Sequence, residues 1–361
     1  MFSAADHAYM AQALCLAEQG LYGTSPNPRV GCVIVNAGKV VGEGWHQRAG
    51  TPHAEVHALH AAGDLARDAT VYVTLEPCSH HGRTPPCADA LIAAGVARVV
   101  VAMQDPNPLV AGQGLARLQA AGVQVDCGVQ ESAARELNIG FVSRMTRQRP
   151  WVRLKTASSL DGKTALNNGV SFWITGEAAR LDVHRLRARA CAILTGIGTV
   201  LADDPRMDVR NVETQRQPLR VVVDSQLRTP VTAKILTGGK TLIVGAIADQ
   251  EKITRLEGAG AEVIILPDAS GKVDLPKLLA ELAQRQLNEV MIEAGGTLNG
   301  ALLNAGLIDE WVMYTAPVLM GNKARGLFDM PELTEMSQRR EVSIQDVRMV
   351  GQDIRIRALL A

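Results

Sequence analysis

The stretch from His53 to Cys87 limits what this chain can fold into more than any other part of the sequence. It contains two of the six cysteines, five of the eight histidines, and a glutamate between the first two of these histidines. The stretch reads as a helix that opens after Pro52, a strand over residues 69–75 and a loop over residues 79–86. A metal site here requires the loop to fold back and bring distant ligands together.

We predict a catalytic zinc ion bound by His53, Cys78 and Cys87. Such an ion has three protein ligands and keeps one position open for water. Two thiolates and a neutral imidazole balance its double charge, and the pKa of the bound water can fall from about 16 toward ~7, which makes hydroxide available at neutral pH. Glu55 is then predicted to carry protons between this water and a substrate nitrogen, without binding the metal.

The spacing of these residues partly matches a known signature. H-A-E at residues 53–55 and P-C at residues 77–78 fit the zinc-deaminase pattern H-x-E…P-C-x-x-C. The second cysteine departs from it, because residues 79–86 place eight residues between the pair instead of two. Two prolines and a glycine make this insert a loop, and its His80 and Arg83 are polar groups suited to an anionic or heterocyclic substrate.

Other interpretations of the stretch stay open. His53 and His57 have the spacing of a zinc-peptidase pair, but there the glutamate directly follows the first histidine, whereas Glu55 is rotated roughly 200° away. A structural zinc site would need a fourth ligand, for which His57 or His81 could serve, and a satisfied polar core is the third possibility. The remaining cysteines lie within or beside apolar runs and are interpreted as small core residues: Cys15, Cys32, Cys127 and Cys191.

Composition narrows the class of protein. Apolar residues make up 47% and charged residues 20% of the chain, as in soluble globular proteins. The 37 basic and 37 acidic residues give zero formal charge, which argues against nucleic-acid binding and favours small-molecule partners. The sequence shows neither a signal peptide nor an apolar run long enough to span a bilayer, and its cysteines do not suggest a disulfide framework. A cytoplasmic protein without membrane contacts is expected.

The length of 361 residues predicts two domains. Residues 143–150 are basic and polar and end in proline, so we place the boundary there and expect domains of residues 1–147 and 148–361. Strands alternate with helices in both halves, which predicts two α/β domains. In the first domain we expect helices that begin near residues 3, 53, 87 and 113, and strands at residues 30–35, 39–45, 69–75, 96–103 and 123–126.

In the second domain, Asp161-Gly162 is expected to form a turn between two extended runs, and Thr175 to cap a helix that reaches about residue 189. Strands are expected at residues 191–196, 219–225, 240–246, 261–267, 288–296 and 311–319.

Two glycine-containing segments of the second domain could bind a dinucleotide. Residues 195–204 follow a strand and offer Gly196 and Gly198, but Leu201 stands where the fingerprint has its third glycine, so a tight turn explains this segment equally well. Residues 293–303 combine a strand, two glycines and a helix start, whose bare N–H groups and positive dipole end could hold a pyrophosphate. Asp224 closes another strand, where an acid favours NAD by binding the ribose hydroxyl.

The motifs PNPRVGCVIV, GWHQRAGTPHAEVHAL and VTLEPCSHHGRTPPC resemble the pyrimidine deaminase half of the bifunctional riboflavin-biosynthesis deaminase–reductase. LKTASSLDGKTA, FWITG, TVLADDPRM and EAGGTLNGALL are similar to the reductase half of that family. The resemblance spans the whole chain, and the long cysteine spacing is this family's own version of the zinc motif. It implies a cytidine-deaminase-like α/β/α domain followed by a dihydrofolate-reductase-like α/β domain.

The resemblance also implies the chemistry. Zinc-dependent hydrolytic deamination would act on 2,5-diamino-6-(5-phosphoribosylamino)pyrimidin-4-one. NADPH would then reduce the ribosyl group to ribityl, giving 5-amino-6-(5-phosphoribitylamino)uracil. It further suggests a homo-oligomer, a dimer formed through the reductase domains. Two alternatives stay open: a nucleic-acid base-editing or binding module, for which 3% aromatics offer little stacking, and a second domain that is a non-catalytic scaffold.

Site residues follow from the same resemblance, motif by motif. Asn27 and His46 would hold the pyrimidine, and His80 and Arg83 would lie near the base or phosphoribosyl group. The residues implied at NADPH are Ala157, Trp173, Thr199, Asp203, Ser225, Gly295, Gly296, Thr297, Leu298, Asn299, Gly300 and Ala301. The residues implied at the reductase substrate are Ser171, Arg187, Met207, Arg210 and Glu293.

Physical arguments also bear on three of these expectations for the reductase domain: the cofactor, the phosphate-binding residues and the proton donor. The family's NADPH conflicts with the preference for NAD that Asp224 suggests, and we expect the neighbouring Ser225 to accept the extra phosphate. The guanidinium groups of Arg187 and Arg210 suit a phosphate, although either could be a solvated surface charge. Lys155 and Asp203 are our candidates for polarisation or proton delivery, and a surface salt bridge would explain these two residues nearly as well.

Overall fold

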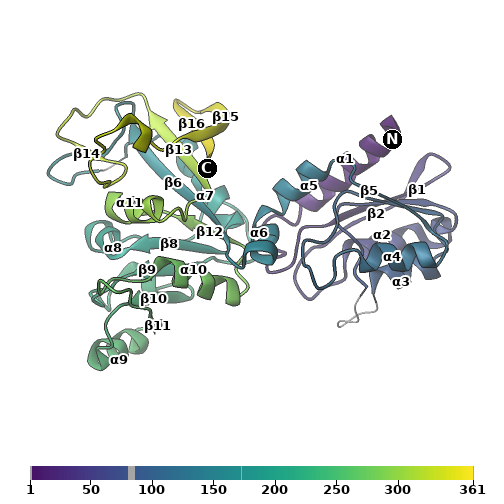
Figure 1. The fold of residues 1–361 in the computed structure, drawn as a ribbon, viewed down its shortest axis with the longest axis horizontal. Helices are drawn as coiled ribbons and strands as arrows, with labels where there is room; N and C mark the ends of the chain where they lie inside the picture. Colours follow the sequence, from purple (N-terminus) through teal and green to yellow (C-terminus); the bar gives the residue numbers. More distant parts are fainter. Residues whose placement is uncertain (1, 80–85, 172, 361) are drawn as a thin grey trace. The chain divides into compact units, whose positions relative to one another are not determined.

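The computed structural model describes residues 2–79, 86–171 and 173–360, and these form two compact units (Figure 1). The division falls between Arg149 and Pro150. Each unit has its own sheet and its own hydrophobic core. The basic segment that we expected to be a linker is partly helical, because the last helix of the first unit continues to Arg147.

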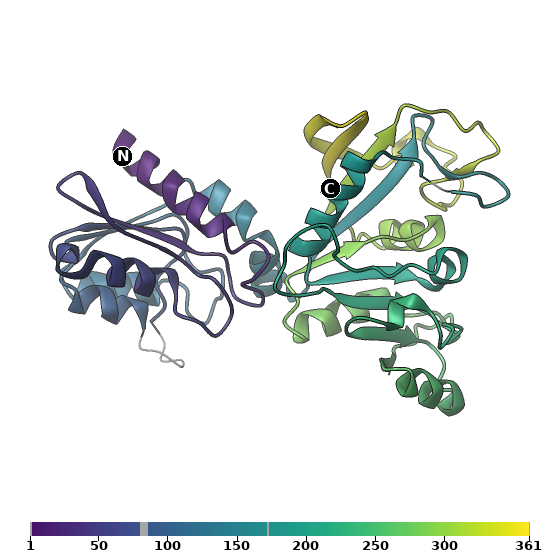
Figure 2. The same ribbon diagram turned by 180° about the vertical axis from the view of Figure 1, so that it is seen from behind.

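The first unit contains a five-stranded sheet in the order β2-β1-β3-β4-β5. Strand β1 runs antiparallel to β2 and β3, whereas β3, β4 and β5 are mutually parallel. Helices α1 and α5 cover one face, and α2, α3 and α4 cover the other (Figures 1 and 2). The elements are α1 (Ala4–Glu18), β1 (Gly31–Asn36), β2 (Lys39–Trp45), α2 (Ala54–Ala62), β3 (Thr70–Val73), α3 (Cys87–Ala93), β4 (Arg98–Val101), α4 (Gln113–Ala120), β5 (Gln124–Cys127), α5 (Glu131–Leu137) and α6 (Ile139–Arg147).

Glycines on the strands let two helices pack directly on the backbone of this sheet. A Cβ atom on Gly31 would lie 1.9 Å from the carbonyl oxygen of Ala13 in α1, and one on Gly44 would lie 2.5 Å from that of Ala54 in α2. The face that α2 presents to β2 carries small residues for the same reason. This close packing fixes the start of α2, where the predicted zinc ligand His53 is located.

Most of the secondary structure expected for the first half is confirmed. The helix expected to begin near residue 3 is α1, where Ser3 and Asp6 form a capping box, and Gly63 ends α2. Helices α5 and α6 were not expected. Two cysteines that we interpreted as core residues, Cys15 and Cys127, are exposed instead, because each lies on the outward side of its element.

The second unit is a nine-stranded sheet in the order β11-β10-β9-β8-β12-β6-β13-β16-β15. The first seven strands are parallel, and β16 and β15 add an antiparallel hairpin. The elements are β6 (Trp151–Ser159), β7 (Lys163–Ala165), α7 (Glu177–Arg189), β8 (Ala192–Gly196), α8 (Ile197–Asp203), β9 (Leu219–Val223), β10 (Thr241–Gly245), α9 (Gln250–Gly258), β11 (Ala261–Ile265), α10 (Leu275–Gln284), β12 (Glu289–Ile292), α11 (Gly296–Asn304), β13 (Glu310–Ala316), β14 (Arg325–Gly326), β15 (Val342–Val350) and β16 (Asp353–Leu360).

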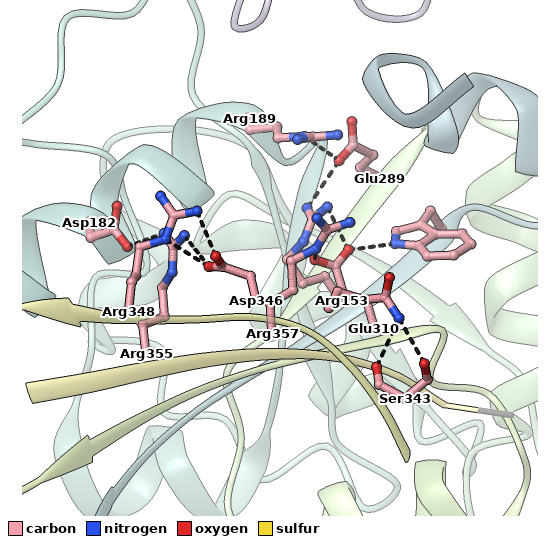
Figure 3. A network of polar contacts seen from close by, with 12 residues as sticks. Arg153, Asp182, Arg189, Glu289, Glu310, Ser343, Asp346, Arg348, Arg355 and Arg357 are labelled. Atoms are coloured by element: carbon pink, nitrogen blue, oxygen red, sulfur yellow. Dashed lines mark hydrogen bonds and ion pairs between the residues drawn. The ribbon is translucent and has the colours of Figure 1, made fainter. Parts of the chain in front are cut away.

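Charged residues at the amino-terminal edge of this sheet are paired with one another (Figure 3). Arg153 on the central strand β6 contacts Glu289 at 3.0 Å and Glu310 at 2.9 Å, and all three are buried. Arg189 and Arg357 complete the network, each 2.7–2.8 Å from one of the glutamates. Removing one partner of a buried pair costs roughly 3–5 kcal/mol because it leaves the other charge unpaired in the interior. These charges are occupied with one another, and the carboxyl ends of the strands remain for a site.

Several expectations for the second half need correction. Thr175 does not cap α7, whose N-cap is Gly176 with no side-chain hydrogen bond. The expected turn at Gly162 is confirmed, with φ +73°, between β6 and β7, and β7 pairs with β14. Gly198 lies inside α8, so the segment after β8 is a direct strand–helix junction. The hairpin of β15 and β16 was not expected at all.

Among the described residues, none of the helices combines the length and the apolar composition needed to cross a membrane.

Candidate zinc centre and reductase site

Three side chains from separate elements meet in the first unit. His53 is the N-cap of α2, Cys78 follows β3 in a non-helical segment, and Cys87 is the first residue of α3. The Nδ1 atom of His53 lies 3.2 Å from Sγ of Cys87 and 3.7 Å from Sγ of Cys78. The three ligand atoms all lie within 4.8 Å of one another, and no other group of this kind occurs in the part of the chain that the structure describes. One imidazole and two thiols form the donor set of a catalytic zinc ion.

A hydrogen bond between their side chains couples the two cysteines. A hydrogen bond from the Cys87 thiol lowers the pKa of Cys78 to about 4 against the effect of burial, and the same hydrogen bond raises the pKa of Cys87. The backbone N–H of Cys87 also donates to Sγ of Cys78 at 3.3 Å. A divalent cation can take the place of this hydrogen bond, because it stabilises both sulfurs as thiolates.

Glu55 lies in the first turn of α2, close to the Cys87 sulfur. It is 3% exposed, and burial raises the pKa of its carboxyl group to about 7. Its side chain forms a hydrogen bond with the Cys87 thiol, which places a carboxyl group beside the predicted ligands without making it one of them. A carboxyl group with a pKa near neutrality suits a role in proton transfer.

Asn27 and His46 also lie beside this cluster. The Nδ1 atom of His46 is 3.1 Å from the carbonyl oxygen of Pro52, and its Nε2 atom is 3.1 Å from Nδ2 of Asn27. Because a carbonyl oxygen only accepts, Nδ1 carries the proton, and burial lowers the pKa of His46, so Nε2 accepts from the Asn27 amide. The His46 ring packs edge-on against that of His53 at 5.4 Å between centroids. His46 is 2% exposed, whereas Asn27 is half-buried.

The remaining histidines of the stretch separate into two groups. His57 is not a member of the metal-binding group, and its Nε2 atom is buried without a hydrogen-bond partner among the described residues. His80, His81 and Arg83 lie outside the described residues, so our expectations for them stay predictions.

A charged cluster occupies the carboxyl end of the central strands in the second unit. Lys155 on β6 places Nζ 3.7 Å from Oε2 of Glu293, which follows β12. Burial lowers the pKa of Lys155, and Glu293 opposes this effect. Burial would raise the pKa of Glu293, but the charges of Arg187 and Lys155 outweigh it and lower that pKa to about 2. Glu293 is therefore a carboxylate at neutral pH.

Arg187 on α7 is held by this carboxylate. Its Nε atom lies 2.5 Å from Oε1 of Glu293 and a terminal nitrogen lies 3.0 Å from Oε2, while the other donates to the carbonyl oxygen of Asp208 at 3.0 Å. Met207, which has φ +50°, contacts the same guanidinium through its sulfur. We expected the fork of Arg187 to be available for a phosphate, but Glu293 occupies it.

Arg210 remains more accessible than Arg187. Its side chain is exposed and pairs with Asp208 at 2.9 Å, and its backbone N–H donates to Nδ1 of His184 at 3.3 Å. Ser171 lies half-buried in the segment before α7. A hollow of about 770 Å³ that the sequence did not indicate opens beside the first turn of α7, lined by Glu177, Ala178, Arg180, Leu181 and Asn211.

Two strand–helix turns lie side by side at the same edge of the sheet. A Cβ atom on Gly295, the N-cap of α11, would lie 4.0 Å from Oγ1 of Thr199 in α8, and one on Gly196 would lie 3.3 Å from the side chain of Leu298. Gly296 is the first residue of α11 and follows the N-cap Gly295. Because neither residue has a side chain, the backbone N–H groups at the start of the helix are not covered by one. This arrangement suits the pyrophosphate of a dinucleotide.

Only part of residues 295–301 can face a ligand. Asn299 is 1% exposed and its amide donates to the carbonyl oxygens of Ala294 and Leu327 at 3.1 and 3.2 Å. A Cβ atom on Gly300 would lie 2.0 Å from the carbonyl oxygen of Asp329. Residues 327–329 thus anchor the turn, a role that the sequence could not indicate because it uses backbone atoms. The exposed residues are Gly295, Thr297 and Ala301.

At the end of β9, Asp224 does not have the ribose-binding position that we expected for NAD. Asp224 is completely buried, and its carboxylate accepts from the backbone N–H of Thr229 at 2.7 Å and from the hydroxyl of Thr229 at 2.8 Å. It therefore shapes a turn and is not accessible to a ribose. Ser225 is half-buried and its Oγ accepts from the N–H of Val273 at 3.2 Å, which leaves the hydroxyl hydrogen available to a phosphate.

Three further predicted residues surround this edge. Ala157 is half-buried on β6, and Asp203 is exposed at the end of α8. Among the described residues, the charges that shift the pKa of Lys155 are those of Glu293 and Arg187, not that of Asp203. Trp173 has φ +50° and is 73% exposed, and the guanidinium of Arg180 stacks on its ring at 4.4 Å.

Family models match both units. Residues 3–103 match the cytidine and deoxycytidylate deaminase zinc-binding region, and residues 150–356 match the RibD C-terminal domain. Fold and sites together define a two-domain enzyme, a zinc-dependent deaminase followed by a dihydrofolate-reductase-like reductase that uses NADPH. The riboflavin biosynthesis protein RibD of Escherichia coli (strain K12) is 51% identical over 362 residues, covering 97% of this chain and 98% of that protein. The chain belongs to the RibD family of bifunctional riboflavin-biosynthesis enzymes.

Other relatives agree over the full length. RibD of Haemophilus influenzae is 45% identical and covers 98% of this chain and 97% of its own length. A solved structure of Acinetobacter baumannii RibD is similar, with a TM-score of 0.91, 47% identity and 99% of each chain covered. The Thermotoga maritima diaminohydroxyphosphoribosylaminopyrimidine deaminase/5-amino-6-(5-phosphoribosylamino)uracil reductase gives a TM-score of 0.89 at 32% identity, again over 99% of each chain.

Proposed function

We propose that the first domain deaminates 2,5-diamino-6-(5-phosphoribosylamino)pyrimidin-4-one and that the second reduces the ribosyl group of the product to ribityl. Deamination replaces a ring C–NH₂ by C=O, consuming water and releasing ammonia. Reduction adds a hydride and a proton to the opened sugar and yields 5-amino-6-(5-phosphoribitylamino)uracil. The convergence of His53, Cys78 and Cys87 beside the Glu55 carboxyl group is the observation that carries the proposal.

In the deaminase site, His53, Cys78 and Cys87 hold zinc. Zinc supplies Lewis acidity when bound, which lowers the pKa of a water molecule toward ~7. Glu55 takes a proton from water and passes it to the departing amino group; its raised pKa supports both steps. Asn27 binds the pyrimidine with its amide oxygen, because its nitrogen is turned toward His46.

This geometry gives His46 an orienting role, since both of its ring nitrogens are occupied. His80 and Arg83 remain assigned to the base or the phosphoribosyl group by the family resemblance alone.

In the reductase site, the turn of residues 295–301 and Thr199 would hold NADPH, which would supply the hydride when bound. Ser225 would donate to its additional phosphate, and the burial of Asp224 supports NADPH over NAD. Further residues assigned to the cofactor are Ala157, Trp173 and Asp203.

Lys155 delivers the proton or polarises the sugar carbon, with Asp203 as the alternative donor. Glu293 holds Arg187 through two hydrogen bonds and Lys155 through a longer ion pair of 3.7 Å. Arg210 binds the substrate phosphate, since its guanidinium is exposed. Ser171 and Met207 complete the substrate site.

Removal of the metal tests whether the two sites are independent. With the phosphoribosylamino pyrimidine as substrate, a chelator is expected to abolish ammonia release. NADPH oxidation on substrate that is already deaminated should continue at the untreated rate. Ammonia and NADPH are followed separately in one incubation, and re-addition of zinc serves as the control. Parallel loss of both activities in a protein that circular dichroism shows to be folded would contradict two independent sites.

The proposal includes pairing of two chains through their reductase domains. Strand β15 ends the nine-stranded sheet, and it exposes Ile344, Val347 and Met349 to between 58% and 61%. An edge strand with apolar side chains readily adds a second strand.

Val347→Lys should shift the solution mass from twice 38.5 kDa toward 38.5 kDa in light scattering. Leu65→Lys is the matched control, because Leu65 is equally exposed, at 59%, on the deaminase unit. An unchanged dimer in the Val347 variant would place the interface elsewhere.

We further assign the deaminase to residues 1–147 and the reductase to residues 148–361. The division of the chain into two compact units between residues 149 and 150 supports this assignment. The enzyme is assigned to the cytoplasm, where thiolate ligands persist in the reduced state.

A further inference from the structure

We infer that helix α4 positions the two zinc thiolates and that it acts through Glu76 and Arg117. Glu76 is not a member of the metal-binding group, and the guanidinium of Arg117 has no lone pair to offer a metal, so both are positioning residues. The inference rests on the proposed zinc ligands, and it explains how two cysteines nine positions apart can hold a fixed separation.

Glu76 lies two residues before Cys78 and is 5% exposed. Its Oε2 atom accepts from the backbone N–H of Gly112 at 2.9 Å and of Asp105 at 3.0 Å. Its Oε1 atom accepts from the N–H of Gly114 at 2.8 Å and of Leu115 at 3.4 Å. Three of these four donors belong to the N-cap and first turn of α4, where orphan N–H groups and the positive helix end favour a carboxylate.

The backbone on either side of this carboxylate is in direct contact as well. A Cβ atom on Gly114 would lie 2.0 Å from the carbonyl oxygen of Pro77, so α4 packs on the peptide that leads into Cys78. The N–H of Glu76 donates to the carbonyl oxygen of Met103 at 3.0 Å, which ties the same segment to the end of β4. Movement of α4 would therefore move Cys78.

Arg117 extends the contact to the other cysteine. It lies on α4 and holds the carboxylate of Asp89 with two nitrogens, at 2.5 and 2.8 Å. Asp89 is in the first turn of α3, two residues after Cys87. A third nitrogen of Arg117 lies 3.4 Å from the carbonyl oxygen of Ser79, directly after Cys78.

Helix α4 thus contacts the chain on both sides of Cys78 and just beyond Cys87. A metal site requires its ligands to be held to about 0.5 Å, and partners outside the ligand set typically change metal affinity by about 10- to 100-fold. Glu76 should contribute more than Arg117, because Glu76 is buried whereas the side chains of Arg117 and Asp89 are 45% and 30% exposed.

Glu76→Gln tests the buried contact. An amide nitrogen would meet backbone N–H donors and leave two of them unsatisfied, so we expect zinc to be released to a chelator about tenfold faster. In the cobalt-substituted enzyme the thiolate-to-metal absorption band should weaken or shift, and kcat for ammonia release should fall with little change in KM. Glu76→Asp, which keeps the carboxylate, should recover part of the loss.

The matched control is Glu131→Gln, which removes an exposed carboxylate at the start of α5, where it pairs with Arg135 at 2.7 Å. NADPH oxidation serves as the internal standard. A Glu76→Gln protein that melts at a lower temperature but keeps the wild-type rate of zinc release and the wild-type cobalt spectrum would overturn the inference, because Glu76 would then be merely structural.

Arg117→Met tests the exposed contact between Arg117 and Asp89. This variant provides the test of the inference if Glu76→Gln does not fold. Zinc release about two- to threefold faster than in Arg135→Met supports a role for α4, and equal rates in these two variants overturn the role of Arg117. A wild-type protein that binds no zinc would overturn the proposed metal site itself. A zinc-binding wild type with unchanged α4 variants would overturn only the present inference.

Discussion

Replacing Glu55 by glutamine should leave the zinc content of the protein unchanged and lower its rate of deamination by about 10²- to 10⁴-fold, the usual contribution of a general acid–base. Glu55 lies outside the metal-binding group, so the three ligand atoms keep their positions. Its carboxyl group has a pKa raised to about 7 by burial and contacts the Cys87 thiol, whereas glutamine is isosteric and cannot exchange a proton.

Zinc content, ammonia release and NADPH oxidation should be measured on the same preparation. NADPH oxidation on deaminated substrate should equal that of the wild type, because Lys155 and Glu293 belong to the other unit. Glu131→Gln, an exposed carboxylate on α5, controls for the loss of a negative charge from the deaminase unit. Normal turnover by the Glu55 variant would exclude proton transfer through this residue, and loss of zinc would instead assign it a structural role.

The grouping of His53, Cys78 and Cys87 was predictable from sequence because metal chemistry determines which residue types form such a group. The unusual separation of Cys78 and Cys87 looked like a departure from the deaminase pattern. The structure accounts for it locally, since the N–H groups of Cys87 and Ala88 donate to the sulfur and carbonyl oxygen of Cys78. These hydrogen bonds bring the two ends of the insert together.

Backbone contacts explain what sequence reasoning missed around the sites. The roles of Glu76 and of residues 327–329 depend on N–H and C=O groups, which every residue carries, so no residue pattern marks them. Likewise, the resemblance placed Arg187 at the substrate and its guanidinium suited a phosphate, but Glu293, just after β12 and 106 residues away along the chain, occupies its fork. A guanidinium pattern alone cannot show which carboxylate comes within reach of it.

Two parts of the fold were hidden for different physical reasons. Residues 131–147 are helical, but their basic, proline-terminated end looked like a linker because charged residues cover the exposed face of α6. Strands β15 and β16 alternate apolar with polar residues, and Arg355 and Arg357 of β16 pair with Asp182, Asp346 and Glu310. In contrast, β8, β10 and β12 were recognisable because they are buried and mostly apolar on both faces.

Replacing Lys155 by methionine should lower the rate of NADPH oxidation by about 10²-fold or more while ammonia release stays normal. Methionine fills a similar volume without an ammonium group. The fold should persist because Glu293 keeps its two contacts to Arg187, so the carboxylate is not left unpaired in the interior. NADPH binding, followed by fluorescence, should be unchanged, since the cofactor turn at Gly295 is formed by other strands.

The pH dependence separates the two roles that Lys155 could have. Burial lowers the pKa of Lys155, so the ammonium form is lost as pH rises through a value below the ordinary one for lysine, and the wild-type rate of reduction should fall on this alkaline limb. Lys155→Arg keeps a positive charge that does not titrate. If Lys155 acts through its charge, this variant should retain part of the rate and lose the alkaline limb. If Lys155 donates the proton, the variant should be as slow as Lys155→Met.

Lys163→Met, on β7 of the same unit, is the matched control. A Lys155→Met enzyme with the wild-type rate and pH profile would contradict the role of Lys155 and would assign the proton transfer to Asp203.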